Sequence, residues 1–236
     1  MSVDINADLG EGAPFDDELL NWVTSANIAC GVHAGDPALM RRTAEAARRA
    51  GVALGAHPGL SDGRRERALS PDEAYAATLD QVRALQAVAG PLRHVKPHGA
   101  LYNMAARDAA LADAIARATR AADPGLVLFG LAGSELVAAG RRAGLAVAEE
   151  AFLDRGYERD GSLTPRGRPG ALLHDPAAAA ARALRIVRDG RLEGVDIPLR
   201  ADTLCVHGDT PEALAMARAL REALAAGGVD VKAFGA

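Results

Sequence analysis

The chain has 236 residues, of which 49% are hydrophobic and 25% charged, and a formal net charge of -4. This composition can bury a sizeable core, provides no basic footprint for nucleic acid, and contains no apolar run of the roughly 18 residues that a membrane span requires. The N-terminal stretch MSVDINADLG lacks the charged and apolar regions of a leader peptide, which predicts a soluble cytoplasmic protein. The two cysteines lie in separate apolar runs, as is typical of buried, reduced thiols.

Short strand-like runs alternate with longer alanine-rich helical runs along the chain. Strands are expected near 3–8, 25–31, 52–58, 94–99, 126–133, 146–152, 202–208 and 229–234. Helices are expected near 16–23, 37–50, 71–89, 108–122, 134–143, 176–189 and 211–226. Several helices begin with a capping side chain followed by proline, at Asp36, Ser70, Asp175 and Thr210, and most end at a glycine.

Repeated βα units predict a distorted (β/α) barrel of seven or eight parallel strands. About 250 residues is a usual size for such a barrel, so residues 1–236 are expected to form a single barrel domain. An open, doubly wound parallel sheet is the alternative. The long irregular segment at 154–175 is either a functional loop or a surface excursion.

Polar and titratable side chains gather where the predicted strands end, which is where both architectures place their ligands. They are Asn6, Asp8, Asn27, His33, His57, Lys96, His98, Glu150, Asp154, His207 and Asp209. Aspartate and histidine bind divalent metals or transfer protons, and the candidate metal ligands are Asp8, His57 and His98. Asparagine side chains either hold a small polar ligand or cap turns, and three of the four asparagines lie within or just after strand ends: Asn6, Asn27 and Asn103.

Lys96 is one of two lysines among 27 basic residues, in a chain that otherwise uses arginine. At the mouth of a dry barrel its ammonium can stabilise a phosphoryl group or an oxyanion, and desolvation can lower its pKa. A salt bridge to a neighbouring carboxylate is the alternative. His98 lies two residues further along the expected strand and on the same side, so the two are expected to act as a pair. His94, at the start of that strand, is expected to be structural.

Several common catalytic motifs are missing from the sequence. There is no GxxxxGK[ST] loop and no GxGxxG after a strand, so a nucleotide would need another arrangement. The absence of a GxSxG elbow disfavours a serine hydrolase. After GAHPGLSDG, the arginines Arg64, Arg65 and Arg67 either clamp an anion or form an ordinary surface cluster.

Seven motifs together closely resemble the LamB/YcsF family: INADLGE, SANIACGVHAGDP, GAHPG, HVKPHGALYN, GLAGSEL, DRGYERDGSLTPR and ADTLCVHGDTP. The resemblance runs in order over nearly the whole chain and implies a distorted barrel related to glycoside hydrolases and deacetylases. It also implies the A subunit of bacterial 5-oxoprolinase, a hydrolase in which it works with the B and C subunits. One departure concerns the loop after Gly59, which is several residues shorter than in relatives and leaves open whether Arg64 or Arg65 replaces the family's arginine.

The reaction implied by this resemblance is the opening of the lactam of 5-oxo-L-proline to L-glutamate, with hydrolysis of ATP and Mg²⁺ as the companion of ATP. The hypothetical catalytic residues are Asp8, Lys96, His98, His207 and Asp209. Lys96 would neutralise the transferring phosphoryl group or the lactam oxygen, and a histidine, His98 or His207, would be the general base. An aspartate, Asp8 or Asp209, would orient that base or hold magnesium.

Substrate binding would involve Asn6, Asn27, His33, His57, Asn103, Asp154 and Arg155. Two other functions remain open. The chain could be a metal-dependent amide or polysaccharide deacetylase that acts alone. It could also be a non-catalytic subunit that binds oxoproline while its partners transfer the phosphoryl group.

Overall fold

The computed structural model describes residues 1–61, 67–208 and 211–235. Four residues named above therefore lie outside the described residues: Arg64, Arg65, Asp209 and Thr210. Of the arginines after GAHPG, Arg67 is described, and it is exposed and donates to the backbone carbonyl of Ala68.

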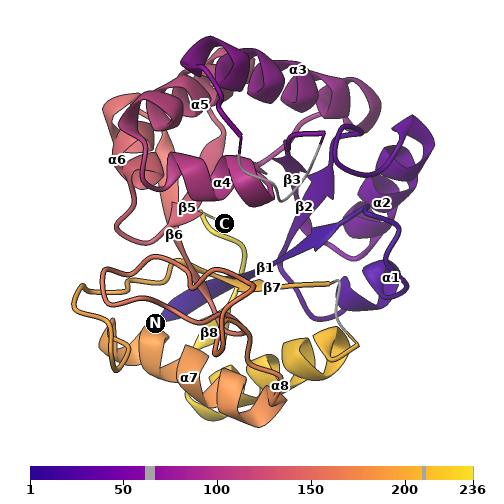
Figure 1. Cartoon of the computed structure of the whole chain (residues 1–236). Helices are drawn as coiled ribbons and strands as arrows, with labels where there is room; N and C mark the ends of the chain where they lie inside the picture. Colours follow the sequence, from indigo (N-terminus) through magenta and orange to yellow (C-terminus); the bar gives the residue numbers. More distant parts are fainter. Residues whose placement is uncertain (62–66, 209–210, 236) are drawn as a thin grey trace.

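Parallel strands form the centre of the molecule (Figure 1). They are β1 Ser2–Leu9, β2 Ser25–Ala29, β3 Ala53–His57, β4 His94–Val95, β5 Val127–Leu131, β6 Ala146–Phe152, β7 Thr203–Val206 and β8 Asp230–Val231. Strands β1 to β7 pair in chain order, β7 returns to β1 and closes the ring, and β8 pairs with the start of β1. The predicted distorted barrel is therefore confirmed, and the open doubly wound sheet is wrong.

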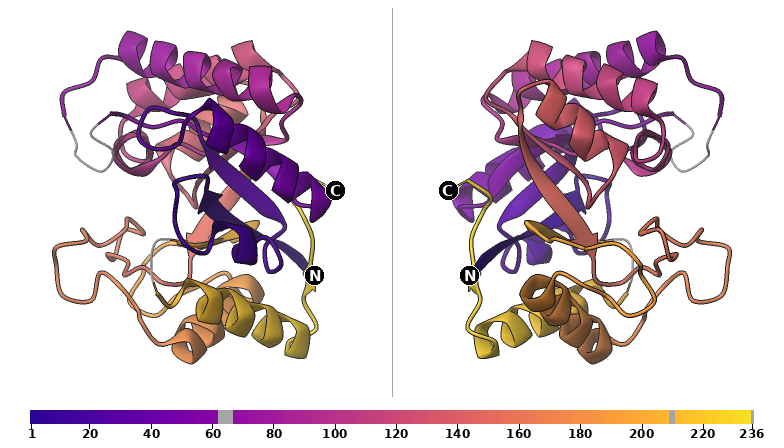
Figure 2. Two further views of the ribbon diagram at one scale, coloured as in Figure 1. Left: turned by 90° about the vertical axis from the view of Figure 1, so that its right-hand side faces the viewer. Right: turned by 90° about the vertical axis from the view of Figure 1, so that its left-hand side faces the viewer.

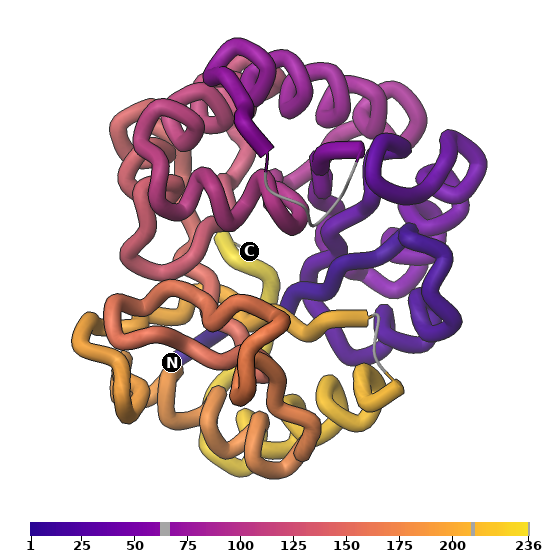
Figure 3. Tube along the Cα trace, viewed as in Figure 1, coloured from indigo at the N-terminus to yellow at the C-terminus, as the bar shows by residue number. Residues whose placement is uncertain are grey.

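Helices surround this ring, and the chain passes around it once in sequence order (Figure 3). They are α1 Asp16–Leu19, α2 Pro37–Arg49, α3 Pro71–Ala89, α4 Gly99–Ala105, α5 Ala109–Ala122, α6 Glu135–Arg142, α7 Pro176–Asp189 and α8 Ala213–Ala226. The described caps are as predicted: Asp36 and Asp175 accept from backbone N–H groups of the first turn, and Ser70 forms a capping box with Glu73.

The expected strand at 94–99 is the main difference between the prediction and the structure. Strand β4 has two residues, and α4 begins at Gly99. Pro97 has no backbone N–H to donate to a sheet ladder, and proline inside a sheet is confined to edges and bulges. Lys96 and His98 therefore lie on the irregular connection between β4 and α4, and strand alternation does not place them on a common face.

The core lies between the barrel and its helices. Strand side chains such as Val95 and Leu128 are fully buried in one cluster with helix side chains such as Leu85, Ile115 and Leu136. Burying an aliphatic side chain of this size stabilises a fold by about 1.5–3 kcal/mol, so each of these side chains between strands and helices contributes to stability. No helix in the described parts of the chain has the length and apolarity needed to cross a bilayer.

The loop between β6 and α7 lies at the opposite end of the barrel from the chain termini, as the two side views of Figure 2 show. It follows the carboxyl end of β6 and contains short antiparallel bridges, Arg155 with Leu172 and Tyr157 with Leu163. The Arg155 guanidinium also donates to the carbonyl oxygens of Thr164 and Ala171. The segment 154–175 is thus tied together by backbone pairing and stands at the ligand-binding end of the barrel.

Candidate active site

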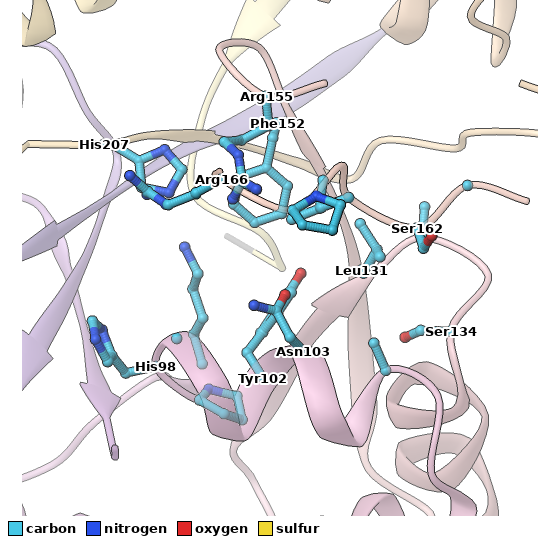
Figure 4. A pocket seen from close by; sticks show the side chains of 18 of the residues that line it. His98, Tyr102, Asn103, Leu131, Ser134, Phe152, Arg155, Ser162, Arg166 and His207 are labelled. Atoms are coloured by element: carbon cyan, nitrogen blue, oxygen red, sulfur yellow. The ribbon is translucent and has the colours of Figure 1, made fainter. Parts of the chain in front are cut away.

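A cavity of about 880 Å³ opens at the carboxyl ends of the strands. The predicted site residues on its wall are Asp8, His57, Lys96, His98, Asn103, Arg155 and His207. Figure 4 shows His98, Tyr102 and Asn103 on one side, with Arg155, Arg166 and His207 across from them. Four predicted residues do not line it: Asn6, Asn27, His33 and Asp154. The volume lies within the range of small-molecule sites.

Lys96 is 2% exposed and lies at the floor of this cavity. Its Nζ atom contacts Glu150 Oε1 at 2.9 Å, Asn6 Oδ1 at 3.0 Å, Asp8 Oδ1 at 3.0 Å and Cys205 Sγ at 3.1 Å. Burial alone would lower the pKa of Lys96, but the Asp8 and Glu150 carboxylates outweigh it and hold that pKa well above its usual value. The salt bridge given as an alternative for Lys96 is formed, and the ammonium is a fixed positive charge that also lines the cavity.

The two asparagines Asn6 and Asn27 lie beneath the cavity and are fully buried. Asn6 Nδ2 donates to Glu150 Oε1 at 2.9 Å and to Thr203 Oγ1 at 2.8 Å. Asn27 Nδ2 donates to Asn6 Oδ1 at 2.7 Å and to Asp8 Oδ1 at 2.8 Å. Their amide groups are thus committed to the partners of Lys96. Both residues lie below the site and position other side chains there, whereas contact with substrate was expected for them.

His94 completes this buried network from below. Its Nε2 lies 2.8 Å from Asn27 Oδ1, and its ring stacks on Phe129 with centroids 4.2 Å apart. Burial lowers the pKa of His94 to about 3, with the nearby Lys96 charge acting in the same direction. The ring is therefore neutral and donates from Nε2 to Asn27, a place in the scaffold that agrees with the sequence interpretation.

A chain of close contacts links four side chains at the ends of β1, β2, β3 and β4. Glu11 Oε1 lies 3.1 Å from His33 Nε2 and 3.5 Å from His98 Nδ1. His98 Nδ1 lies 3.0 Å from His57 Nε2, while His57 Nδ1 is 2.7 Å from the carbonyl oxygen of Lys96. His98 therefore contacts His57 and Glu11, and the expected pairing of His98 with Lys96 is not made through their side chains.

Asp8 lies between this histidine group and Lys96. Its Oδ2 is 3.4 Å from His57 Nε2, and its Oδ1 is 3.0 Å from Lys96 Nζ. Burial alone would raise the pKa of Asp8, but His57 and Lys96 hold it well below its usual range. Asp8 is thus an ionised acceptor on the cavity wall.

His207 lines the cavity next to strand β7. Its Nδ1 lies 2.7 Å from Asp154 Oδ2, and its ring packs against Phe152 with centroids 5.5 Å apart. Burial alone would raise the pKa of Asp154, but His207 lowers it, so the carboxylate stays ionised and fixes the imidazole. A histidine oriented through Nδ1 by a carboxylate presents Nε2 for proton transfer. Asp154 thus acts on His207, whereas sequence reasoning had placed it in contact with substrate.

Two arginines carry positive charge on the same side of the cavity. Arg155 is buried and donates to backbone carbonyl oxygens, and Arg166 lines the cavity beside it (Figure 4). Burial lowers the pKa of Arg155, and the proximity of Arg166 lowers it further. Two guanidinium groups held close together favour an anionic ligand between or beside them.

Sequence reasoning did not include Glu11, Tyr102, Phe152 and Arg166 in the site. Tyr102 donates to Glu150 Oε2 at 2.7 Å, and the Phe152 ring centroid lies 5.4 Å from Lys96 Nζ. Glu11 and Tyr102 stand inside the motifs INADLGE and HVKPHGALYN, which could have signalled them. Arg166 is the last residue of the motif DRGYERDGSLTPR, which could have signalled it in the same way.

The LamB/YcsF family model matches residues 3–236, almost the whole chain. This chain belongs to the LamB/YcsF family. It is 56% identical to the 5-oxoprolinase A subunit of Methylococcus capsulatus, covering 99% of this chain and 96% of that protein. It is 51% identical to the 5-oxoprolinase A subunit of Bacillus subtilis, covering 99% and 97%.

Two solved structures have folds similar to that of this LamB/YcsF chain. The lactam utilization protein of Thermus thermophilus is 49% identical, with a TM-score of 0.90 and coverage of 99% of this chain and 100% of that one. A family 4 carbohydrate esterase of Streptomyces lividans is 12% identical, with a TM-score of 0.54 and coverage of 98% and 91%. The esterase shares the barrel architecture with this chain.

Proposed function

We propose that this chain is the A subunit of an ATP-dependent 5-oxoprolinase, which opens the lactam of 5-oxo-L-proline to L-glutamate while ATP is hydrolysed to ADP and phosphate. The observation that carries the proposal is 51–56% identity, over nearly the full chain, to relatives named as the A subunit of 5-oxoprolinase. That name implies partner subunits, and we assign these as the B and C subunits. The name of the Thermus thermophilus protein, a lactam utilization protein, points to the same chemistry.

Coupling to ATP suits the chemistry of an unstrained amide. Transfer of the γ-phosphoryl group to the lactam oxygen releases ADP and activates the ring carbon. Water then adds to that carbon, the C–N bond breaks as the nitrogen takes up a proton, and a second water hydrolyses the acyl phosphate to L-glutamate and phosphate. Mg²⁺ would accompany ATP and neutralise its phosphates.

The cavity provides groups for these steps. The fixed Lys96 ammonium lies where it can stabilise charge on the lactam oxygen or the phosphoryl group. His207, oriented by Asp154, is the general base that takes a proton from water. Arg155 and Arg166 supply a positive surface for the carboxylate of oxoproline or for phosphate.

The reconstituted enzyme tests this proposal. The chain is combined with the B and C subunits, and ATP-dependent release of glutamate is measured from 5-oxoproline. Activity should require the mixture, and Lys96→Ala should abolish it. Lys232→Ala is the matched control, because Lys232 is the other lysine and lies away from the cavity. A folded Lys96→Ala protein with full activity would remove Lys96 from its central role.

The role of His207 is tested separately, because its side chain is partly exposed and its replacement should not unfold the barrel. His207→Gln should lower kcat strongly while leaving the KM for oxoproline within a few fold, as expected for a group used in proton transfer. An unchanged kcat would assign the general base to another residue.

A non-catalytic oxoproline-binding subunit is the second candidate function, and the absence of a known phosphate-binding loop from the sequence favours it. Isothermal titration of the isolated chain separates the two. Binding of oxoproline without binding of a non-hydrolysable ATP analogue would favour a binding subunit whose partners transfer the phosphoryl group. Likeness to the esterase extends to the fold and gives no support to a deacetylase.

A further inference from the structure

Four side chains with metal-ligating atoms converge at the carboxyl ends of β1 to β4. One donor atom from each lies within 4.8 Å of the others, and the residues are Glu11, His33, His57 and His98. We propose that these four residues bind one divalent transition-metal ion. Glu11, His57 and His98 line the same cavity as Lys96 and His207, but the proposed oxoprolinase reaction assigns no step to them, so the metal site does not depend on that function.

The spacing of the four donors suits one ion. Their successive separations are 3.1 Å from His33 Nε2 to Glu11 Oε1, 3.5 Å from Glu11 Oε1 to His98 Nδ1, and 3.0 Å from His98 Nδ1 to His57 Nε2. Ligands about 2.0–2.1 Å from a tetrahedral ion lie roughly 3.3–3.4 Å apart. The three measured separations lie within about 0.4 Å of this value, and every other pair of these donor atoms lies within 4.8 Å.

His57 is oriented as a metal-binding histidine usually is. Its Nδ1 lies 2.7 Å from the carbonyl oxygen of Lys96, an acceptor, so the Nδ1 proton is donated there. Nε2 is then the ring atom left to bind a metal, and it lies 3.0 Å from His98 Nδ1. The ionised Asp8 Oδ2 also lies 3.4 Å from this Nε2. A cation bound at Nε2 would therefore also be attracted by the Asp8 carboxylate.

Packing contacts also fix the imidazole rings of His33 and His98 within the cluster. The His33 and His98 rings stack at 3.8 Å with an interplanar angle of 7°. The His33 Nδ1 atom is buried and has no hydrogen-bond partner among the described residues. Gly59 leaves room for the ring, since a Cβ at that position would lie 2.6 Å from His33 Nδ1.

Three imidazole nitrogens and one carboxylate oxygen select ions of the zinc and cobalt class over magnesium and calcium, which prefer oxygen ligands. A second group of donors, Asp8, Cys205 and His207, is a poorer cation site. The Lys96 ammonium already lies 3.0 Å from Asp8 Oδ1 and 3.1 Å from Cys205 Sγ, so its positive charge would repel an ion there. When bound at the first group, the ion would supply a Lewis acid at the cavity wall.

The test is direct metal binding to the full-length chain. After treatment with a chelator, the protein is titrated with Co²⁺ alone and then with Zn²⁺, following the visible absorption of Co²⁺ and the heat of binding. We expect about one ion per chain, the intense absorption of a low-coordinate Co²⁺ site, and a higher Tm with Zn²⁺.

Glu11→Gln and His33→Gln should each weaken Co²⁺ binding at least tenfold, on the order of the losses seen when metal-site groups are replaced. Glu11 is partly exposed, so Glu11→Gln should keep the fold, which circular dichroism checks. His174→Gln, at an exposed histidine, and His207→Gln, in the second donor group, should bind Co²⁺ as the parent does. The proposal is overturned if the parent binds no stoichiometric ion, if Glu11→Gln binds equally well, or if His207→Gln alone loses the ion.

Discussion

The buried His94 side chain should make this protein lose stability in mild acid, because its surroundings lower its pKa. The side chain is fully buried on Phe129 and has its pKa lowered from 6.5 to about 3. Its neighbours Lys96, His57 and Arg93 add to the effect of burial, and Asp8 opposes it. In the unfolded chain the same imidazole takes up a proton near its ordinary pKa, so between these two values the unfolded state binds more protons than the folded state.

The sign and size of the effect follow from that difference. Stability from neutral His94 is fully present above pH 6.5 and is lost as pH falls toward 3. Between pH 8 and pH 5, a shift from 6.5 to about 3 removes about 2 kcal/mol from the free energy of unfolding. This loss is a large fraction of the stability of an ordinary domain.

The assay is urea unfolding of the parent and of His94→Gln at both pH values, followed by circular dichroism. Glutamine cannot titrate and keeps an N–H donor for Asn27, while the lost contact with Phe129 affects both pH values equally. The loss of stability between pH 8 and pH 5 should therefore be about 2 kcal/mol smaller in His94→Gln than in the parent. His174→Gln, at an exposed histidine, should lose as much as the parent. Equal losses in the parent and in His94→Gln would refute the reasoning.

Three further predictions rest on the same interior. Gly55→Ala should destabilise the protein by about 1–3 kcal/mol or more in thermal or urea unfolding, because its Cβ would lie 2.0 Å from the ring of His94. Gly167→Ala is the control and should be nearly neutral, because a Cβ there meets open space. Burial raises the pKa of Cys30 to about 12 and also raises the pKa of Cys205. Both thiols should therefore resist Ellman's reagent at pH 8 until urea exposes them, and rapid labelling of the native protein would contradict this. Tyr102→Phe removes a buried hydrogen bond to a carboxylate and should cost about 1.5–3 kcal/mol of unfolding free energy, with no change in stability counting against that bond.

The sequence alone determined the architecture and much of the chemistry. Alternating strand and helix patterns, proline-marked caps and glycine stops report local backbone preferences, so the order of the elements could be taken from them. In parallel α/β folds, the carboxyl ends of strands meet at one edge, and this rule brought Asp8, Lys96 and His207 to one cavity before any contact was known. Full-length motifs indicated the family in the same way.

The tertiary structure decided which of these groups touch one another. Lys96 meets Glu150 from β6, and Asn6 meets the same carboxylate across 144 positions in sequence, because closing the barrel brings β1 beside β7 and close to β6. Local patterns report which residues follow a strand, and they carry no information on partners that meet through ring closure. For that reason the salt bridge of Lys96, the positioning role of Asn6, and the contact of Glu11 with His33 and His98 became visible only in the folded chain.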